Sequence, residues 1–335
     1  MCLVNRFRAG QCGFIENMRD LTMGRLVTLF GGGGLLGRYV AQELLKAGAR
    51  VRIAERDPSD AWFLKPLGGL GQTQFVAADI TKPASLARAV QGSDSVVNLV
   101  GILKGDFDRI HHVGAANVAK AAKGAGASAF VQVSAIGADA ESGSAYGRSK
   151  AAGEVAVKSA FPAATIVRPS VIFGQEDGFI NRFAKMQMMP FVPVLRGEAK
   201  LQPVWAADVA KAIAAAALEP DLYAGKTFEL GGPEVVTMQG VNEWIAKATG
   251  RSPNFVPVPD AVGTIIAAIG SFVPGAPITR DQWQMLLTDN VVAPGAAGLE
   301  AFGIAPTPME AVAPAWLVQY RLHGRFTMNT KSAVQ

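Results

Sequence analysis

The chain has 335 residues, of which 50% are hydrophobic and 18% are charged. This length and composition allow two lobes with a large core and exclude an intrinsically disordered chain. The net charge of +5 contains no run of like charges, and two cysteines with three histidines cannot build a disulfide framework or a metal cluster, so we expect no nucleic-acid partner and no metal.

Residues 1–22 carry arginines but lack the apolar segment of a secretory signal. Met23 directly precedes the first predicted strand, so we interpret residues 1–22 as an N-terminal extension. A transit peptide is the alternative, which the acidic residues Glu16 and Asp20 disfavour. The cysteine usage indicates a reducing compartment, and we expect a cytoplasmic protein.

A glycine-rich turn follows the first predicted strand, Leu26–Phe30, and precedes a helix-like stretch at Tyr39–Ala47. Its spacing is G-x-x-G-x-x-G, with glycines at Gly31, Gly34 and Gly37. A strand that turns sharply into a helix through glycines lets the backbone approach a bulky ligand, and the exposed N–H groups of the helix N-terminus favour a pyrophosphate. The turn therefore predicts a dinucleotide site.

Strands and helices alternate through the first half of the chain. Further strands are predicted at Arg50–Ala54, Gln74–Ala78, Ser95–Val100, Ala129–Ser134 and Thr165–Val167, and helices at Pro83–Val90, His112–Ala125 and Ala145–Ala160. This rhythm predicts an α/β fold, a Rossmann-type doubly wound parallel sheet. Ligands of such sheets lie at the carboxyl ends of the strands. We expect the nucleotide to contact Gly31, Gly34, Leu35, Leu36, Gly37, Arg56, Asp79, Ile80, Val100, Gly101, Tyr146, Lys150 and Pro169.

The rhythm breaks after Phe173-Gly174, and it returns only with an alanine-rich helix at Val209–Leu218 and a strand at Thr227–Leu230. We therefore predict a nucleotide-binding domain at 23–174 that 202–232 rejoins, and a smaller C-terminal substrate or partner lobe at 175–201 and 233–335. The apolar run at 261–273 is too short to span a bilayer. A core helix and a helix that faces a membrane surface or a partner are the alternatives there.

The end of the second strand decides between NAD and NADP. An acidic side chain there accepts the ribose hydroxyls and repels a 2′-phosphate, whereas an arginine pairs with that phosphate. The chain places Glu55 and Arg56 side by side. We expect NADP(H), with NAD(H) as the alternative.

Three side chains form a candidate catalytic group. Tyr146 and Lys150 have the Y-x-x-x-K spacing, which places both on one face of a helix. A lysine ammonium beside a phenol is expected to lower the phenol's pKa and to make Tyr146 a general acid or base. Ser134 ends the fifth predicted strand, where its hydroxyl could hold a substrate oxygen.

Together these features resemble the short-chain dehydrogenase/reductase superfamily in its extended or atypical branch. The motifs that carry the likeness are the glycine turn, Asp79-Ile80, Ser134, Tyr146 with Lys150, and Arg168-Pro169. A narrower resemblance, over residues 24–325, is to the NADPH-binding accessory subunit of respiratory complex I and its bacterial relatives. It is carried by residues 160–177, Gln202–Val204, Asp208-Val209, residues 279–282 (TRDQ), Asp289–Val291 and residues 313–317 (APAWL).

The resemblance implies a Rossmann fold that carries NADPH, whose role can be structural, and a partner in complex I or at the periphery of the respiratory membrane. The alternative is an active NAD(P)-dependent oxidoreductase or epimerase/dehydratase acting on a small carbonyl or hydroxyl compound. Two positions depart from the pattern. Phe173 stands where sugar-nucleotide enzymes carry a tyrosine, and Gly32-Gly33 replaces the usual Ala-Ser.

Overall fold

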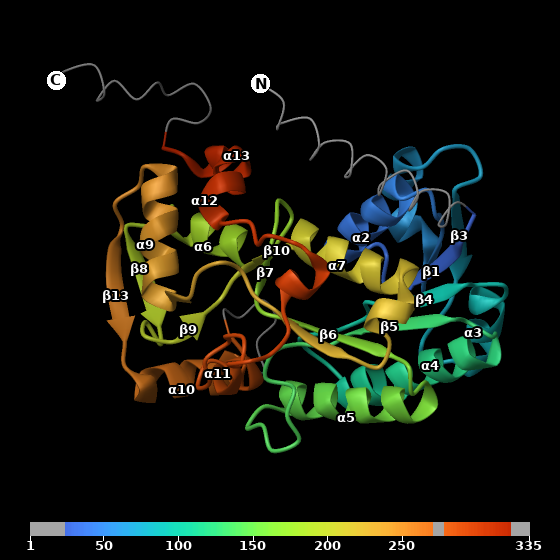
Figure 1. Cartoon of the computed structure of the whole chain (residues 1–335). Helices are drawn as coiled ribbons and strands as arrows, with labels where there is room; N and C mark the ends of the chain where they lie inside the picture. Colours follow the sequence, from blue (N-terminus) through green and yellow to red (C-terminus); the bar gives the residue numbers. More distant parts are fainter. Residues whose placement is uncertain (1–23, 271–277, 323–335) are drawn as a thin grey trace, which may run out of the picture.

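The computed structural model describes residues 24–270 and 278–322, so the interpretation of residues 1–22 lies outside the described residues. Its centre is a seven-stranded parallel sheet in the order β11-β6-β5-β4-β1-β2-β3 (Figure 1). The strands are β1 (Leu26–Phe30), β2 (Arg50–Glu55), β3 (Thr73–Ala77), β4 (Ser95–Asn98), β5 (Ala129–Val133), β6 (Thr165–Pro169) and β11 (Thr227–Leu230). The strand order reverses between β1 and β4, which confirms the predicted doubly wound fold.

Helices cover both faces of this sheet. One face packs against α2 (Leu35–Lys46) and α7 (Ala206–Leu218), and the other against α3 (Pro83–Val90), α4 (Ala115–Gly124) and α5 (Ala145–Ala160). Because both faces are covered, β1 is buried at every position and reads as one apolar run. The alanines of α7 let that helix lie close to the sheet and to α2 at once. Two shorter elements, η1 (Pro58–Leu67) and α8 (Pro220–Tyr223), complete the larger lobe.

Two helices begin elsewhere than the sequence predicted. The first was expected from Tyr39, but α2 begins at Leu35 and contains Gly37. Glycine is a poor helix former, so Gly37 kept the sequence pattern from showing the first turn of α2. A glycine stands at this position because the first turn of the helix packs against the glycine loop. The other was expected from His112, but residues Asp108–Gly114 form a π-helical turn, η2, before α4 begins.

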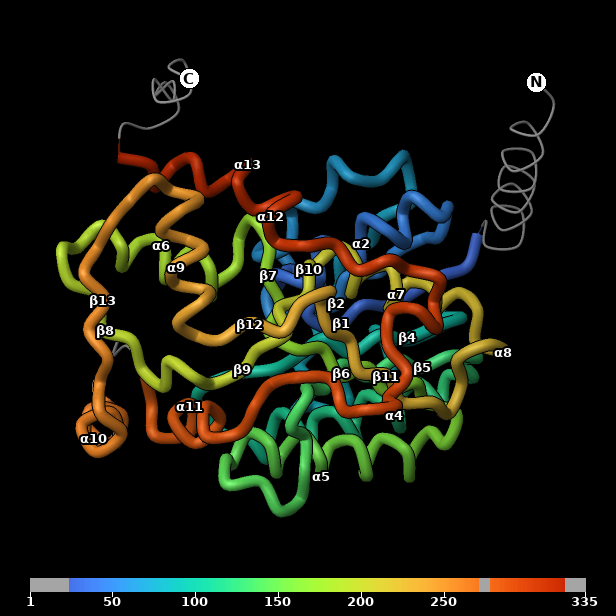
Figure 2. Tube along the Cα trace, turned by 60° about the vertical axis from the view of Figure 1, so that its left-hand side comes forward, coloured from blue at the N-terminus to red at the C-terminus, as the bar shows by residue number. Residues whose placement is uncertain are grey.

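The smaller lobe is built from short paired strands and helices. Strand β7 (Ile172–Phe173) pairs with β10 (Val204–Trp205), β9 (Lys200–Leu201) with β12 (Val236–Thr237), and β8 (Phe191–Leu195) with β13 (Asn254–Val258). The helices are α6 (Ile180–Met186), α9 (Met238–Thr249), α10 (Asp260–Gly270), α11 (Arg280–Met285), α12 (Met309–Val312) and α13 (Pro314–Leu317), with short turns η3 (Leu299–Phe302) and η4 (Val318–Tyr320). Apart from η3, which packs on the larger lobe, these elements surround a separate apolar core, in which Phe173 and Ile245 are fully buried. Figure 2 shows β8, β13 and α10 at the end of the molecule opposite α8 of the sheet domain.

One stretch assigned by sequence to the smaller lobe packs in the core of the larger one. Leu299 is buried against α7 and the sheet, and Phe302 stacks on Tyr223 with ring centroids 4.5 Å apart. The amide of Glu229, in β11, donates to the carbonyl of Ala297. The chain therefore crosses back to the sheet after α11, and the two lobes are tied together there.

Helix α10 carries its bulky apolar side chains on the outside. Val262 is 45% exposed, and Ile265 and Ile269 are each 60% exposed. The buried positions are small, and a Cβ on Gly263 would lie only 2.4 Å from the ring of Trp283. Of the two alternatives for this segment, the core helix is therefore wrong for residues 260–270. In the described ranges no helix is both long enough and apolar enough to span a bilayer.

Candidate nucleotide and catalytic site

The glycine turn places a row of free amides at the start of α2. Gly31 has φ of 81°, a conformation that glycine adopts readily, and its carbonyl accepts a hydrogen bond from the amide of Gly34 at 3.2 Å. Within the described residues the amides of Leu35, Leu36 and Gly37 donate to no protein group. These unpaired donors, together with the helix dipole, fit a pyrophosphate.

Gly37 and Gly34 have different structural roles in this turn. A Cβ on Gly37 would lie 2.4 Å from the carbonyl oxygens of Gly31 and Gly32, so Gly37 is needed for the packing of helix against turn. A Cβ on Gly34 would meet only the Gly31 carbonyl oxygen, at 3.4 Å. Beyond its chain neighbours, no other atom of the described residues would lie within 4 Å of a Cβ at Gly34, so a ligand can approach the backbone at this position.

The two candidate specificity residues at the end of β2 differ in their surroundings. Glu55 is partly buried, and its carboxylate accepts a 2.6 Å hydrogen bond from the amide of Gly33. Burial raises the pKa of Glu55, although the bond from Gly33 opposes that shift. Arg56 is exposed and, within the described ranges, forms no ion pair. Glu55 therefore holds the glycine turn, whereas the Arg56 guanidinium is free to meet a ligand.

The remaining predicted nucleotide contacts lie at the carboxyl ends of β3, β4 and β6, on the same edge of the sheet. Val100 packs against the turn, because a Cβ on Gly31 would lie 3.2 Å from the Val100 nitrogen. Asp79 is turned toward its own loop and accepts hydrogen bonds from the amide and hydroxyl of Thr81. Ile80 is buried among the apolar side chains beneath α3 and α4, and the Pro169 carbonyl accepts a hydrogen bond from the amide of Ile136.

The three candidate catalytic residues meet where β5 ends and α5 begins. Lys150 is buried, and its ammonium donates to the carbonyl of Val133, the residue before Ser134, at 3.2 Å. The same ammonium lies 5.7 Å from the centroid of the Tyr146 ring. Ser134 is 4% exposed, and its hydroxyl has no hydrogen-bond partner among the described residues. A buried hydroxyl without a partner is costly, so Ser134 is suited to a ligand oxygen.

Burial shifts the pKa of Tyr146 in the direction opposite to the one predicted from the sequence. Lys150 was expected to lower the pKa of Tyr146, but burial raises the pKa of Tyr146 to about 12. Burial also lowers the pKa of Lys150 to about 8, against the opposing charge of Glu154. Loss of solvent around the phenol is the cause of the Tyr146 shift, and the Lys150 ammonium, 5.7 Å from the ring centroid, does not reverse it. Tyr146 is therefore a protonated group at neutral pH.

His111 belongs to this cluster, although the sequence analysis did not single it out. Its Nε2 accepts from the amide of Ile102 at 2.9 Å, so the ring proton lies on Nδ1, which is 2.9 Å from the Ser149 hydroxyl. Burial lowers the pKa of His111 to about 3, and the charge of Lys150 adds to the effect. The neutral ring meets Tyr146 edge to face, with centroids 5.2 Å apart.

Gly101 and Phe107 complete the surroundings of the tyrosine. A Cβ on Gly101 would lie 3.3 Å from the Lys150 ammonium and 3.7 Å from His111 Nε2, which explains a glycine after β4. Phe107 stacks on His111 at 5.5 Å and meets the Tyr146 ring edge-on at 5.9 Å. The Y-x-x-x-K spacing locates Tyr146 in the sequence, but no local pattern marks the two rings that pack on it.

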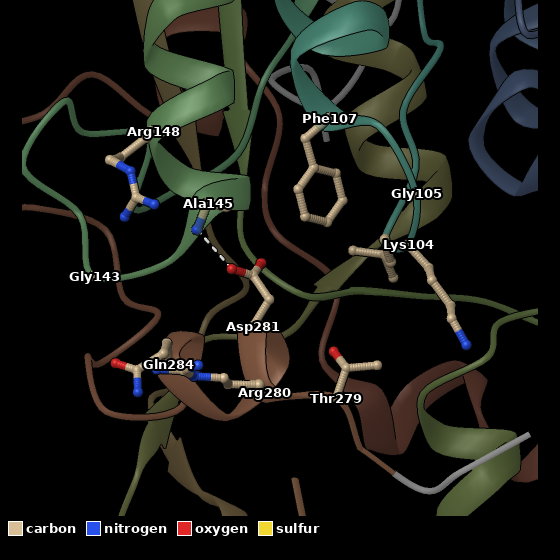
Figure 3. A pocket seen from close by; sticks show the side chains of 11 residues that line it. Lys104, Gly105, Phe107, Gly143, Ala145, Arg148, Thr279, Arg280, Asp281 and Gln284 are labelled. Carbon is tan, nitrogen blue, oxygen red and sulfur yellow. Dashed lines mark hydrogen bonds between the residues drawn. The ribbon is translucent and has the colours of Figure 1, made fainter. Parts of the chain in front are cut away.

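A residue of the smaller lobe caps the helix that carries Tyr146. The Asp281 carboxylate accepts a hydrogen bond from the amide of Ala145 at 2.6 Å (Figure 3). It also accepts one from the amide of Tyr146 at 3.2 Å, and the Ser144 hydroxyl accepts from the amide of Gly147. Asp281 lies in α11, which begins with a capping box between Thr279 and Gln282. The TRDQ motif noted in the sequence thus links the smaller lobe to the N-terminus of α5.

Comparison with known proteins places these features in a family. Residues 27–231 match the NAD dependent epimerase/dehydratase family. The chain is 37% identical over 300 residues to the mouse (Mus musculus) mitochondrial NADH dehydrogenase [ubiquinone] 1 alpha subcomplex subunit 9, a match that covers 87% of this chain and 79% of the relative. The corresponding subunit of Arabidopsis thaliana is 33% identical over 323 residues, covering 91% and 80%.

A solved structure shares the fold. The NADPH-dependent quinone oxidoreductase QOR2 of Escherichia coli, in complex with NADPH, superposes with a TM-score of 0.71 at 19% identity and covers 87% of this chain and 99% of its own. The similarity to the mitochondrial subunits extends beyond the residues of the family match and includes most of the smaller lobe.

Proposed function

The chain belongs to the NAD dependent epimerase/dehydratase family and is similar to the complex I subunit, and from this premise we propose that it binds NADPH as a structural cofactor and serves as an accessory protein of a respiratory complex. One observation carries the proposal. The amides of Leu35, Leu36 and Gly37 have no hydrogen-bond partner among the described residues, and only the Gly31 carbonyl oxygen lies near the position of a Cβ at Gly34. That cradle fits a pyrophosphate.

The preference for NADPH over NADH rests on the end of β2. An acidic residue selects NAD when its carboxylate is available to the ribose hydroxyls. Here the Glu55 carboxylate is already bonded to the amide of Gly33, whereas Arg56 is exposed. A guanidinium is well suited to a 2′-phosphate because it donates several hydrogen bonds from one plane. Binding of both nucleotides to the purified protein would test this choice directly.

A structural role for the nucleotide agrees with the state of Tyr146. A general acid works best with a pKa near the working pH, but burial raises the pKa of Tyr146 to about 12. Tyr146 is also flanked by Phe107 and His111. In this proposal Tyr146 and Lys150 line the nicotinamide end of the nucleotide, and bound NADPH stabilises the fold by mass action.

We further propose that a protein partner covers the exposed face of α10, with the chain lying at the periphery of the membrane. Ile265 and Ile269 point outward from a helix that buries only small residues. Ile265→Ser with Ile269→Ser should abolish co-purification with complex I and leave NADPH binding intact. Val155, 71% exposed on α5, provides the matched control as Val155→Ser. Equal loss in both variants would exclude α10 as the contact surface.

A second candidate function, reduction of a small carbonyl compound, is favoured by the Ser134 hydroxyl. This hydroxyl is buried and has no hydrogen-bond partner among the described residues. The Lys150 ammonium donates to the carbonyl of Val133, the residue before Ser134. Bound NADPH would supply the hydride. Ser134 would donate a hydrogen bond to the substrate carbonyl oxygen, and Tyr146 would give that oxygen its proton as the alcohol forms. Lys150 would hold the charge left on the tyrosine.

Thermal unfolding and a turnover screen separate the two functions. The accessory role predicts that NADPH raises the Tm while a panel of aldehydes, ketones and quinones produces no oxidation of NADPH. The reductase predicts turnover that falls about 10²–10⁴-fold in Tyr146→Phe, the usual weight of general acid catalysis, with NADPH binding unchanged. Turnover that survives Tyr146→Phe would reject this mechanism, and absence of any NADPH-dependent stabilisation would reject the accessory role.

A further inference from the structure

A pocket of about 520 Å³ lies between the two lobes, beside the N-terminus of α5. Figure 3 shows its walls: the segment with Lys104 and Phe107, the start of α5 with Arg148, and the start of α11 with Asp281. Its volume lies in the range of small-molecule sites, which is about 300–1,000 Å³. None of the glycines of the nucleotide turn lines it, and neither does Arg56. The pocket is therefore separate from the pyrophosphate cradle.

The charged side chains of the pocket leave an excess of positive charge. Lys104 is exposed and forms no ion pair in the described structure, and Arg148 bonds only the neutral carbonyl of Ser142. Arg280 lines the same pocket. The acidic lining residue, Asp281, has its carboxylate against the amides that begin α5, so the helix dipole already compensates its charge. An anion entering the pocket would meet Lys104 and Arg148, which form no ion pair with a carboxylate of the described residues.

The pocket also has an apolar side. Phe107 lines it, and Leu103 is 54% exposed beside it. An apolar wall that faces a pair of cations suits a ligand with two chemically different ends. Phe107 also meets the Tyr146 ring edge-on, so a molecule against Phe107 lies one ring away from Tyr146.

We propose that this pocket binds an anionic amphiphile, a molecule that carries a phosphate or carboxylate on an apolar chain. Lys104 and Arg148 meet the anionic group from opposite sides of the pocket, and Leu103 and Phe107 contact the chain. This site goes beyond the proposed NADPH function and does not depend on it, because it uses none of the residues that cradle the nucleotide.

Calorimetry on the whole chain with saturating NADPH tests the proposal with three probes. Octyl phosphate carries both the anion and the chain, inorganic phosphate only the anion, and octyl glucoside only the chain. Octyl phosphate should bind at least about tenfold more tightly than either of the others, because only it uses both walls. Equal affinity for octyl phosphate and octyl glucoside would overturn the role of the cations. Equal affinity for octyl phosphate and inorganic phosphate would overturn the role of the apolar wall.

Charge-removing variants locate the site. Lys104→Gln and Arg148→Gln should each weaken octyl phosphate about tenfold, as expected for a lost charge-assisted hydrogen bond, with octyl glucoside and NADPH unchanged. Arg88→Gln removes the same charge from an exposed position on α3 and is the matched control. Because Lys104 has no hydrogen-bond or ion-pair partner among the described residues, its variant decides the question even if Arg148→Gln fails to fold. Unchanged binding in Lys104→Gln would refute the site.

A final arm distinguishes the sources of the amphiphile. Sedimentation with phosphatidylglycerol vesicles, compared with phosphatidylcholine vesicles, reports binding to a membrane lipid. Association with the anionic vesicles that is lost in Lys104→Gln supports the site and identifies a lipid. Octyl phosphate binding without vesicle association supports the site and identifies a soluble amphiphile. Failure of NADPH binding alone would count against the proposed function and not against this pocket.

Discussion

Replacing Gly34 by valine should abolish nucleotide binding and leave the fold intact. Gly34 has φ of −73° and ψ of 177°, an extended conformation that a β-branched residue adopts readily. A Cβ there would meet only one protein atom, the Gly31 carbonyl oxygen at 3.4 Å. The added methyl groups would instead occupy the space through which a pyrophosphate reaches the amides of α2. The free energy of unfolding of the variant without nucleotide should lie within about 0.5 kcal/mol of the wild-type value.

Gly37→Ala provides the opposite case in the same turn. Its Cβ would lie 2.4 Å from the carbonyl oxygens of Gly31 and Gly32, and backbone atoms cannot rotate away as a flexible side chain can. Forcing an extra methyl group into a packed site costs about 1–3 kcal/mol. Gly37→Ala should therefore lower the Tm without nucleotide, whereas Gly34→Val should not.

Thermal unfolding with and without NADPH measures both effects. At an NADPH concentration of 100 Kd the nucleotide stabilises the folded wild type by about 2.7 kcal/mol, and a hundredfold loss of affinity leaves only about 0.4 kcal/mol of this. Gly124→Ala, in α4 with no atom near the added methyl group, is the matched control and should keep the full NADPH effect. If Gly34→Val also keeps the full effect, the nucleotide does not lie against this turn and our reasoning is wrong.

Three further outcomes follow from the site. Arg56→Ala should weaken NADPH by about 1.5–3 kcal/mol and leave NADH affinity unchanged, as measured by calorimetry; a wild type that prefers NADH would contradict this. Asp281→Ala should destabilise the fold by about 0.5–2 kcal/mol, the cost of a lost helix cap, whereas Glu198→Ala, at an exposed site, should not; equal Tm values would refute the capping role. In the folded protein burial lowers the pKa of His111 to about 3, whereas in the unfolded chain the ring takes up a proton below about pH 6.5. The free energy of unfolding should therefore fall as the pH drops between these values, by up to about 1.4 kcal/mol per pH unit. Denaturant titrations of His111→Gln should show a flatter pH profile.

Local chemistry in the sequence determined the fold and the position of the glycine turn. Apolar runs bounded by turns predicted every strand of the large sheet to within about two residues, because a strand covered on both faces needs continuous burial. The glycine spacing predicted the turn before α2, since only glycine permits the approach of Gly37 to the carbonyls of Gly31 and Gly32. The Y-x-x-x-K spacing predicted that Tyr146 and Lys150 share a helix face, because neighbours four residues apart always do.

Only the tertiary structure decided what surrounds those residues. Asp281 caps α5 from 135 residues beyond Tyr146, and Phe107 and His111 reach the tyrosine from another element. The direction of the Tyr146 pKa depends on burial by those neighbours, so a spacing rule that contains only Lys150 predicts the wrong sign. The outward face of α10 was equally undetermined, because an apolar run has the same sequence whether its glycines or its isoleucines face the core. Periodicity and steric limits act between near neighbours, whereas desolvation and capping depend on contacts between residues far apart in the chain.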